Sequence, residues 1–302
     1  MKKLVGFLGI FGLLLLAVQA QAVTLGKYDA GLLVPSVYHD GAQVDTVVGI
    51  TCQLDCTSHN ATAKRVIHWT FFDIDSHHVT DGTLVCTDDD LVGFSWKASA
   101  GRLLDNKEGY LVFHSTAPDL QIAGNAFLVD QANKDAIFVP VIPLDAADFA
   151  GAPQNEPDTI MALANGIQAG TVFDVRYWLD PTYNAATTIV VWLVDPYVDS
   201  KKKAIPMTVN AWNDDEQLKS VTITLPHELN KIIPCNIPGM PLDFVDGFIN
   251  MTMPGSNAGF AYSYISSSLF GAQQTLLAAE CGEAREASQP SQPCGCTGAG
   301  GR

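Results

Sequence analysis

Two short stretches decide the fold: residues 66–73 read VIHWTFFD, and residues 189–195 read IVVWLVD. Both are rich in β-branched and aromatic residues, which favour the extended backbone of a β-strand. Each carries a central tryptophan, Trp69 or Trp192, and closes on an aspartate. Similar stretches recur between Gly, Asn, Asp and Pro breaks, a spacing typical of sandwiches and barrels. The sequence therefore predicts an all-β protein.

Features of the first half reappear in the second half in the same order, which predicts two tandem antiparallel β-sandwich modules related by duplication. The strand around Trp69 is matched by the strand around Trp192 at an offset of 123 residues. Glu108–Leu111 is matched by Asp246–Ile249 at an offset of 138, and an insertion at Lys201–Asp215 would explain the change. The alternative is that similar strands recur by chance in an all-β chain.

The predicted modules cover residues 23–148 and 159–275. Between them, Leu144–Asp158 contains Gly-Ala-Pro and Asn-Glu-Pro, which break the strand pattern as linkers do. We expect a short helix within Leu269–Ala287, because its Gln, Leu and Ala residues favour that conformation. Residues 280–302 lack large apolar side chains, so burial cannot offset the entropy of ordering them, and we expect a disordered tail.

The N-terminus is typical of an export signal. Lys2 and Lys3 precede an apolar run from Leu4 to Val18, and residues 20–22, Ala-Gln-Ala, match a cleavage site. The run is shorter than the roughly 20 residues of a spanning helix, and the later sequence holds no stretch of that length. Residues 1–22 are therefore predicted to be a signal peptide, with a mature protein that starts at Val23 and is secreted, periplasmic or at the cell surface.

Charge and cysteine content limit the partners of this chain. Its formal net charge of −15 repels phosphate backbones and disfavours a nucleic acid partner. The seven cysteines suit a compartment that permits disulfides, and the spacing of Cys52 and Cys56 suggests a bridge across a tight turn. An odd count leaves one thiol free or shared, and Cys294 and Cys296 in the tail could join a partner through a disulfide.

The most chemically suggestive cluster lies in one loop of the first module and consists of Asp73, Asp75, His77, His78 and Asp81. Its carboxylates could hold calcium, and its histidines could hold a transition metal. An EF-hand loop is excluded because His78 and Leu84 occupy the places of the required glycine and glutamate. The competing interpretation is a solvated hairpin turn. Asp195–Lys203, taken as the related loop, sets lysines beside its acids, so the sequence predicts that the first loop folds without a metal.

The sequence contains none of the common catalytic motifs that we looked for. It has no G-x-S-x-G elbow, no H-E-x-x-H and no Gly-rich phosphate loop. We therefore expect a non-enzymatic protein with a structural or binding role toward an extracellular ligand or surface component. The alternatives are a polysaccharide-acting hydrolase that uses a carboxylate pair such as Asp73 and Asp75, and a self-assembling surface subunit.

Overall fold

The structure is a computed structural model, and it describes residues 25–54, 64–115, 117–146, 172–194, 197–198, 201–202, 204–253, 259–268 and 276–277. The strands of the first half are β1 (Gly31–Val37), β2 (Val44–Leu54), β3 (Arg65–Asp73), β4 (His78–Cys86), β5 (Leu91–Ser95), β6 (Gly109–Ser115), β7 (Leu120–Asp130), β8 (Asp135–Val139) and β9 (Ile142–Leu144). Those of the second half are β10 (Val172–Trp178), β11 (Ala186–Leu193), β12 (Tyr197–Val198), β13 (Lys201–Lys202), β14 (Ile205–Asn213), β15 (Leu218–Leu225), β16 (Leu229–Ile232), β17 (Asp246–Thr252), β18 (Gly259–Ser266) and β19 (Leu276–Leu277). The helical turns are α1 (Trp96–Ala100) and the 3-10 helices Arg102–Leu104, Pro181–Tyr183 and Pro234–Asn236.

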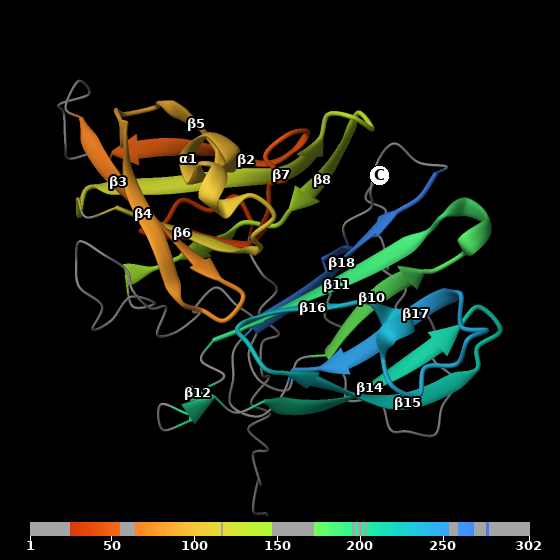
Figure 1. The fold of residues 1–302 in the computed structure, drawn as a ribbon. Coiled ribbons are helices and arrows are strands. Elements are labelled where there is room, and N and C mark those ends of the chain that lie inside the picture. Colours follow the sequence, from red (N-terminus) through yellow and green to blue (C-terminus); the bar gives the residue numbers. More distant parts are fainter. Residues whose placement is uncertain are drawn as a thin grey trace, which may run out of the picture.

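These strands form four antiparallel sheets, which we name A to D (Figure 1). Sheet A has the order β5-β2-β7-β8 and sheet B the order β4-β3-β6-β1-β9. Sheet C has the order β16-β11-β18-β19 and sheet D the order β10-β17-β14-β15, while β12 and β13 form a separate hairpin. Sheets A and B enclose one apolar core, and sheets C and D enclose part of another. The all-β fold class and the two sandwiches predicted from the sequence are confirmed.

The two sandwiches have the same topology. When β1 to β8 are replaced in order by β10, β11 and β14 to β19, sheet A becomes sheet C. The same replacement turns sheet B, apart from its edge strand β9, into sheet D read in reverse. Every strand of the second sandwich therefore has a counterpart in the first.

A threonine hydroxyl makes the same hydrogen bonds in both sandwiches. The Thr46 hydroxyl accepts from the backbone N–H of Tyr38 at 2.9 Å and donates to its carbonyl oxygen at 3.0 Å. The Thr187 hydroxyl does the same with Trp178, at 2.7 and 2.9 Å. These bonds tie the end of β1 to β2 and the end of β10 to β11. They fix the correspondence of the strands at an offset of 141 residues for the threonines and 140 residues for their partners.

The offset stays nearly constant further along the chain. The β3–β4 turn closes with a backbone bond from Ser76 to Asp73, and the β14–β15 turn closes with one from Glu216 to Asn213. Gly109 is the first residue of β6 and Gly247 the second residue of β17, and a Cβ at either position would collide with a carbonyl oxygen of the neighbouring strand. The last pair keeps the predicted offset of 138, and the turn gives 140.

One part of the predicted alignment is wrong. Trp69 lies in β3 of sheet B, whereas Trp192 lies in β11, whose counterpart is β2 of sheet A. The residue that corresponds to Trp192 is Thr51. Both tryptophan strands are apolar and end near a turn, so local pattern alone could not separate them, and an insertion at Lys201–Asp215 is not required.

Sheets B and C are buried on both faces, and this joins the sandwiches into a stack. One face of sheet B contributes Leu111 and Phe113 to the first core, and the other contributes Tyr110 and Val112 to a cluster shared with sheet C. In β6 and β11 consecutive residues are consequently buried, while the outer strand β15 alternates between buried and exposed. Figure 1 shows β16, β11 and β18 on the side of the second sandwich that faces the first.

The C-terminal helix prediction is wrong where the structure describes that segment. Leu276 and Leu277 form β19, which pairs with Ser263 and Tyr262 of β18. The other residues of 269–287 lie outside the described residues, as do the predicted signal peptide 1–22, the linker core 147–158 and the tail 280–302. Within the described part of the chain, no helix is long and apolar enough to cross a membrane.

The disulfide differs from the predicted one. Cys52 bonds to Cys86 across the first core, with their Cα atoms 6.5 Å apart, and not to Cys56. Cys52 faces inward from β2, where it meets the end of β4 in the opposite sheet. In the second sandwich the corresponding residues are Leu193 and Leu225, both fully buried. The bridge therefore occupies inward positions that are aliphatic in the other sandwich.

Removal of this disulfide should destabilise the protein measurably. The bridge closes a loop of 34 residues, for which the chain-entropy model gives about 4 kcal/mol of stabilisation. We expect Cys52→Ala/Cys86→Ala to lower the free energy of unfolding by that amount in urea titrations followed by tryptophan fluorescence. The control Cys235→Ala, at an exposed thiol, should change it by less than about 0.5 kcal/mol. Equal stabilities of all three proteins would contradict the assigned bridge.

Candidate functional site

The acidic loop predicted from the sequence is the turn of the β3–β4 hairpin. Asp73 Oδ1 accepts the backbone N–H groups of Asp75 and His77, at 2.9 and 3.0 Å. In the second sandwich Asn213 Oδ1 accepts the N–H of Gln217 at 2.7 Å. Because an amide oxygen builds the same turn, the negative charge of Asp73 is not needed to form it.

The structure brings together three of the five predicted metal ligands. One ligand atom each from Asp73, Asp75 and His77 lie within 4.8 Å of one another. His78 and Asp81 form a separate contact, with Nε2 and Oδ2 3.3 Å apart. The described side chains thus divide the predicted cluster into a triplet at the turn and a pair on β4.

Asp75 also has a partner in the second sandwich. Its Oδ1 lies 3.0 Å from Nδ1 of His227, which precedes β16. His227 lies far from Asp75 in the sequence and belongs to no recognisable motif, so sequence pattern does not predict this contact. A sequence signal for this contact is the continuous apolar run of β11, which indicates a strand buried on both faces. Burial of the second face requires the first sandwich to lie against it.

Further polar contacts border the same junction. The Tyr110 hydroxyl donates to Glu228 Oε2, and both side chains are buried. Lys231 Nζ lies 3.2 Å from Glu108 Oε1. The Tyr110 ring also meets the Trp192 ring edge-on, with centroids 5.8 Å apart. These contacts, together with that of Asp75, give the acids around the loop structural partners between the sandwiches.

One histidine on the face of sheet B that is turned toward the second sandwich, His114, is held neutral by its surroundings. His68 and His114 are cross-strand partners in β3 and β6. Burial, and after it the neighbouring His68, lowers the pKa of His114 to about 4. At neutral pH His114 therefore carries no charge, which suits a sheet face that continues into the apolar junction.

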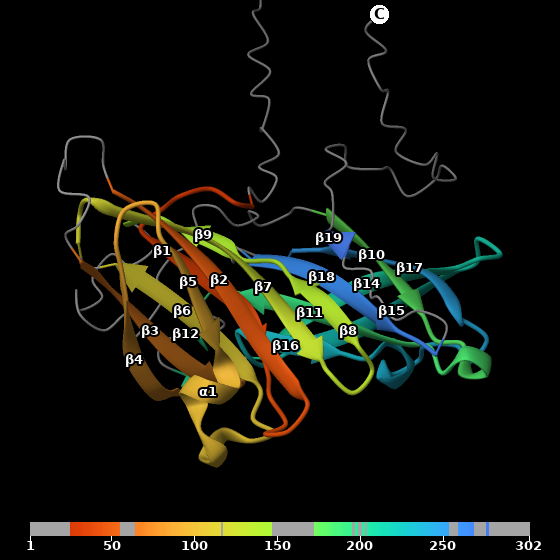
Figure 2. The ribbon, with the colours of Figure 1, turned by 90° about the horizontal axis from the view of Figure 1, so that it is seen from above.

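A shallow surface depression lies in a different part of the molecule. The outer face of sheet A carries a shallow groove of about 400 Å³. Figure 2 shows the three strands that form it, β5, β2 and β7, side by side in the first sandwich. The groove is lined by Val47, Val48, Gly49, Gly93, Phe94, Ser95, Asn125 and Phe127.

The floor of the groove is a pair of glycines. Gly49 and Gly93 are cross-strand partners in the middle of β2 and β5. A Cβ at Gly93 would meet no atom within 4 Å, and one at Gly49 would meet only the end of Leu91, at 3.8 Å. Glycine weakens a strand interior and often marks a place where a ligand or another chain approaches closely. Within the part of the chain that the structure describes, no packing contact demands glycine at these two positions.

Aromatic and aliphatic side chains stand beside this floor. Phe127 is 40% exposed, and its ring meets that of Phe138 with centroids 5.7 Å apart. Leu91, which bounds the floor along β5, is 70% exposed. Asn125 adds an amide, whereas the Ser95 hydroxyl is engaged in donating to Asp45 at 2.6 Å. The exposed surface is mainly apolar with a small number of polar groups, as ligand sites are.

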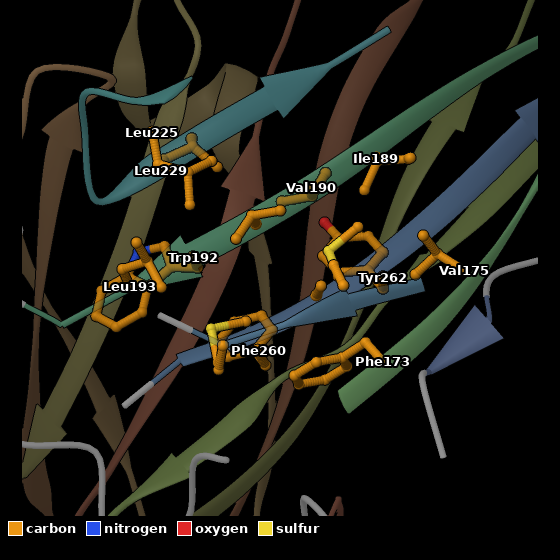
Figure 3. Packing of buried hydrophobic residues seen from close by; sticks show 14 of the residues in the cluster. Phe173, Val175, Ile189, Val190, Trp192, Leu193, Leu225, Leu229, Phe260 and Tyr262 are labelled. Carbon is orange, nitrogen blue, oxygen red and sulfur yellow. The ribbon is translucent and has the colours of Figure 1, made fainter. Parts of the chain in front are cut away.

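The positions that form the groove in sheet A are occupied by larger residues in sheet C. By strand register, Gly49, Gly93 and Asn125 correspond to Val190, Lys231 and Tyr262. The larger residues fill this face of sheet C, and Figure 3 shows Val190 and Tyr262 among the packed side chains. Sheet B covers that face through the shared core. Among the described residues, no second sheet covers the corresponding outer face of sheet A.

Comparisons with known proteins assign no family to the chain. No protein-family model and no curated protein matches it. Among solved structures it is similar to the N-terminal CBM22-1-CBM22-2 tandem domain of Xyn10C from Paenibacillus barcinonensis, with 12% identity, 80% of each chain covered and a TM-score of 0.19. That score is too low to support an argument about fold or ligand.

The β3–β4 turn should fold without a metal ion. An ion held by Asp73, Asp75 and His77 would bind only the native state, and at 100 times its dissociation constant would add about 2.7 kcal/mol of stability. We expect thermal melts in excess calcium, excess zinc and chelator to coincide. The control Asp73→Asn should melt with the wild type, because Asn213 builds the same turn. A rise in melting temperature with either ion that Asp73→Asn or His77→Ala abolishes would contradict this prediction.

Proposed function

We propose that this chain is an exported, non-enzymatic protein that binds an extracellular ligand or surface component through the groove on the outer face of sheet A. The observation that carries the proposal is the paired glycine floor of Gly49 and Gly93, open to solvent and bounded by Leu91 and Phe127. The floor leaves room for an apolar or aromatic part of a ligand to lie directly against the backbone.

Two observations support export. Residues 1–22 have the charge, apolar run and small-residue site of a signal peptide. The Cys52–Cys86 disulfide suits the periplasm or the extracellular space, because cytosolic thiols are kept reduced.

The acids of the first sandwich support a binding role over hydrolysis. A glycosidase needs two carboxylates directed at one bond of a bound substrate. Asp73 accepts two backbone N–H groups of its own turn, and Asp75 faces His227 of the second sandwich. Both carboxylates therefore have structural partners, and the groove lies on a different sheet.

A substitution that fills the groove should weaken ligand binding and stabilise the fold. A valine at position 93 would project into the groove without a clash, and it suits a strand better than glycine. We expect Gly93→Val to raise the free energy of unfolding by about 0.5–1 kcal/mol and to weaken binding of the neutral fluorescent probe N-phenyl-1-naphthylamine by about tenfold. Fluorescence titration at low protein concentration measures the second effect.

The matched control is Thr222→Val, which places the same side chain at an exposed position of β15 in sheet D. It should leave probe affinity unchanged. The proposal fails if the wild type does not bind the probe, or if Gly93→Val and Thr222→Val bind it as the wild type does.

A further inference from the structure

The outer face of sheet D carries a row of apolar side chains that reaches across three strands. Figure 1 shows β17, β14 and β15 on the side of the second sandwich that is turned away from the first. Trp212 and Phe248 are cross-strand partners on this face, and Phe248 is 47% exposed. Leu218 is the partner of Trp212 on β15 and is 50% exposed. We call Phe248, Trp212 and Leu218 the ring row.

A row of hydrogen-bonding side chains runs parallel to the ring row on the same face. Its members are successive cross-strand partners from β10 to β15, and we call them the polar row: Asp174, Asn250, Asn210 and Ser220. Residues two apart in a strand share a face and lie about 7 Å apart, so each amide stands beside a ring. Across its four strands the polar row spans roughly 14 Å.

Two hydrogen bonds orient the polar row. Asn250 Nδ2 donates to Asp174 Oδ1 at 2.7 Å, and the Ser220 hydroxyl donates to Asn210 Oδ1 at 2.8 Å. Within the described part of the chain, Asn210 Nδ2 and Asn250 Oδ1 have no protein partner. The middle of the row therefore offers a fixed donor and a fixed acceptor to a ligand.

The ring row has a counterpart that sheet B buries. By register, Phe72 and Tyr110 of sheet B correspond to Trp212 and Phe248. Phe72 and Tyr110 stack with centroids 5.0 Å apart, and the Tyr110 ring also meets Trp192 of sheet C. The pair on sheet D is aromatic as well, but among the described residues no other sheet covers it. The ring row therefore suits a partner that presents an apolar face.

The polar row excludes a second apolar sheet as that partner. Leu33 and Val112 of sheet B pack in the shared core, and they correspond by register to Asp174 and Asn250. An apolar surface over sheet D would take the polar row out of water without supplying hydrogen-bond partners, which is costly. The occupant must instead offer an apolar face to the rings and hydrogen-bonding groups about 7 Å away.

Charge disfavours an anionic occupant. The strands of sheet D hold two cations, Arg176 and Lys219. Arg176 is the partner of Phe248 and bonds both carboxylate oxygens of Asp246, at 3.0 and 2.8 Å, whereas Lys219 alternates onto the opposite face. The described loops at the ring end of the sheet add five acids, Asp180, Asp214, Asp215, Glu216 and Asp243. The face has no free cation to attract an anion, and these acids would repel one.

We propose that the outer face of sheet D binds a neutral saccharide chain, with sugar rings on Trp212 and Phe248 and their hydroxyls on the polar row. A sugar ring exposes C–H groups on its flat side and hydroxyls around its edge, so it meets both rows at once. Amide side chains suit hydroxyls because they supply donors and acceptors together. This site lies on a different sandwich from the groove of sheet A and does not depend on it.

Affinity electrophoresis of the mature chain tests this site in gels that contain hydroxyethylcellulose, laminarin, arabinoxylan or galactomannan. We expect at least one of these neutral polysaccharides to retard the wild type. Phe248→Ala should weaken that binding by about tenfold through lost stacking, and Asn210→Ala by about as much through lost hydrogen bonds. The control Val85→Ala removes a side chain that is 50% exposed on β4 and should bind as the wild type does.

Circular dichroism checks that each variant folds, and either site variant alone carries the test if the other does not. The proposal is overturned if none of the four polysaccharides retards the wild type, or if a folded site variant is retarded as strongly as the wild type. Stronger retardation by anionic carboxymethylcellulose than by hydroxyethylcellulose would also overturn it. Retardation that Gly93→Val abolishes would place the saccharide in the groove of sheet A, which overturns this site but supports the proposed function.

Discussion

The structure depends on one constraint: sheets B and C have apolar side chains on both faces, so neither can border water. Each sheet meets its own sandwich partner on one side, and the two cover each other on the remaining side. A strand with two buried faces no longer alternates, which is why β6 and β11 are nearly continuous apolar runs. The result is a stack in which two of the four sheets are interior and two are terminal.

Polar contacts at the edge of the junction specify how the sandwiches fit. Apolar burial has no direction, whereas the bond from Tyr110 to Glu228 and the contact of Asp75 with His227 each need a particular alignment. Tyr110 contributes both apolar burial and a directional bond, since its ring packs on Trp192 while its hydroxyl donates to Glu228. The loop that resembled a metal site in the sequence thus contributes to the alignment of the sandwiches.

Much of this fold was predictable, and the errors have physical causes. Composition and strand propensity predicted the all-β class and the two sandwiches, because both depend on residues that are neighbours in the sequence. The pairing of Trp69 with Trp192 failed because one faces a sandwich core and the other the junction, a difference that strand propensity does not encode. The Cys52–Cys86 bridge depends on which strands oppose across the core, and spacing suggested Cys56 instead. At Leu276 and Leu277 an available edge of β18 overrides helix propensity.

The candidate site was less predictable than the fold. From the sequence alone, a glycine inside a strand indicates only a less stable strand. The register adds that Gly49 and Gly93 lie side by side on an open face. Comparison of the two sandwiches then identifies the glycine pair as a candidate site, because the same positions are filled by larger residues and covered in sheet C. Two similar sandwiches in one chain therefore supply a covered and an uncovered version of one surface.

The central claim is that the shared core makes the two sandwiches one cooperative unit. Differential scanning calorimetry of the mature chain tests it most directly. The account predicts a single transition in which the calorimetric enthalpy equals the van't Hoff enthalpy. Two separable transitions, one for each sandwich, would contradict it.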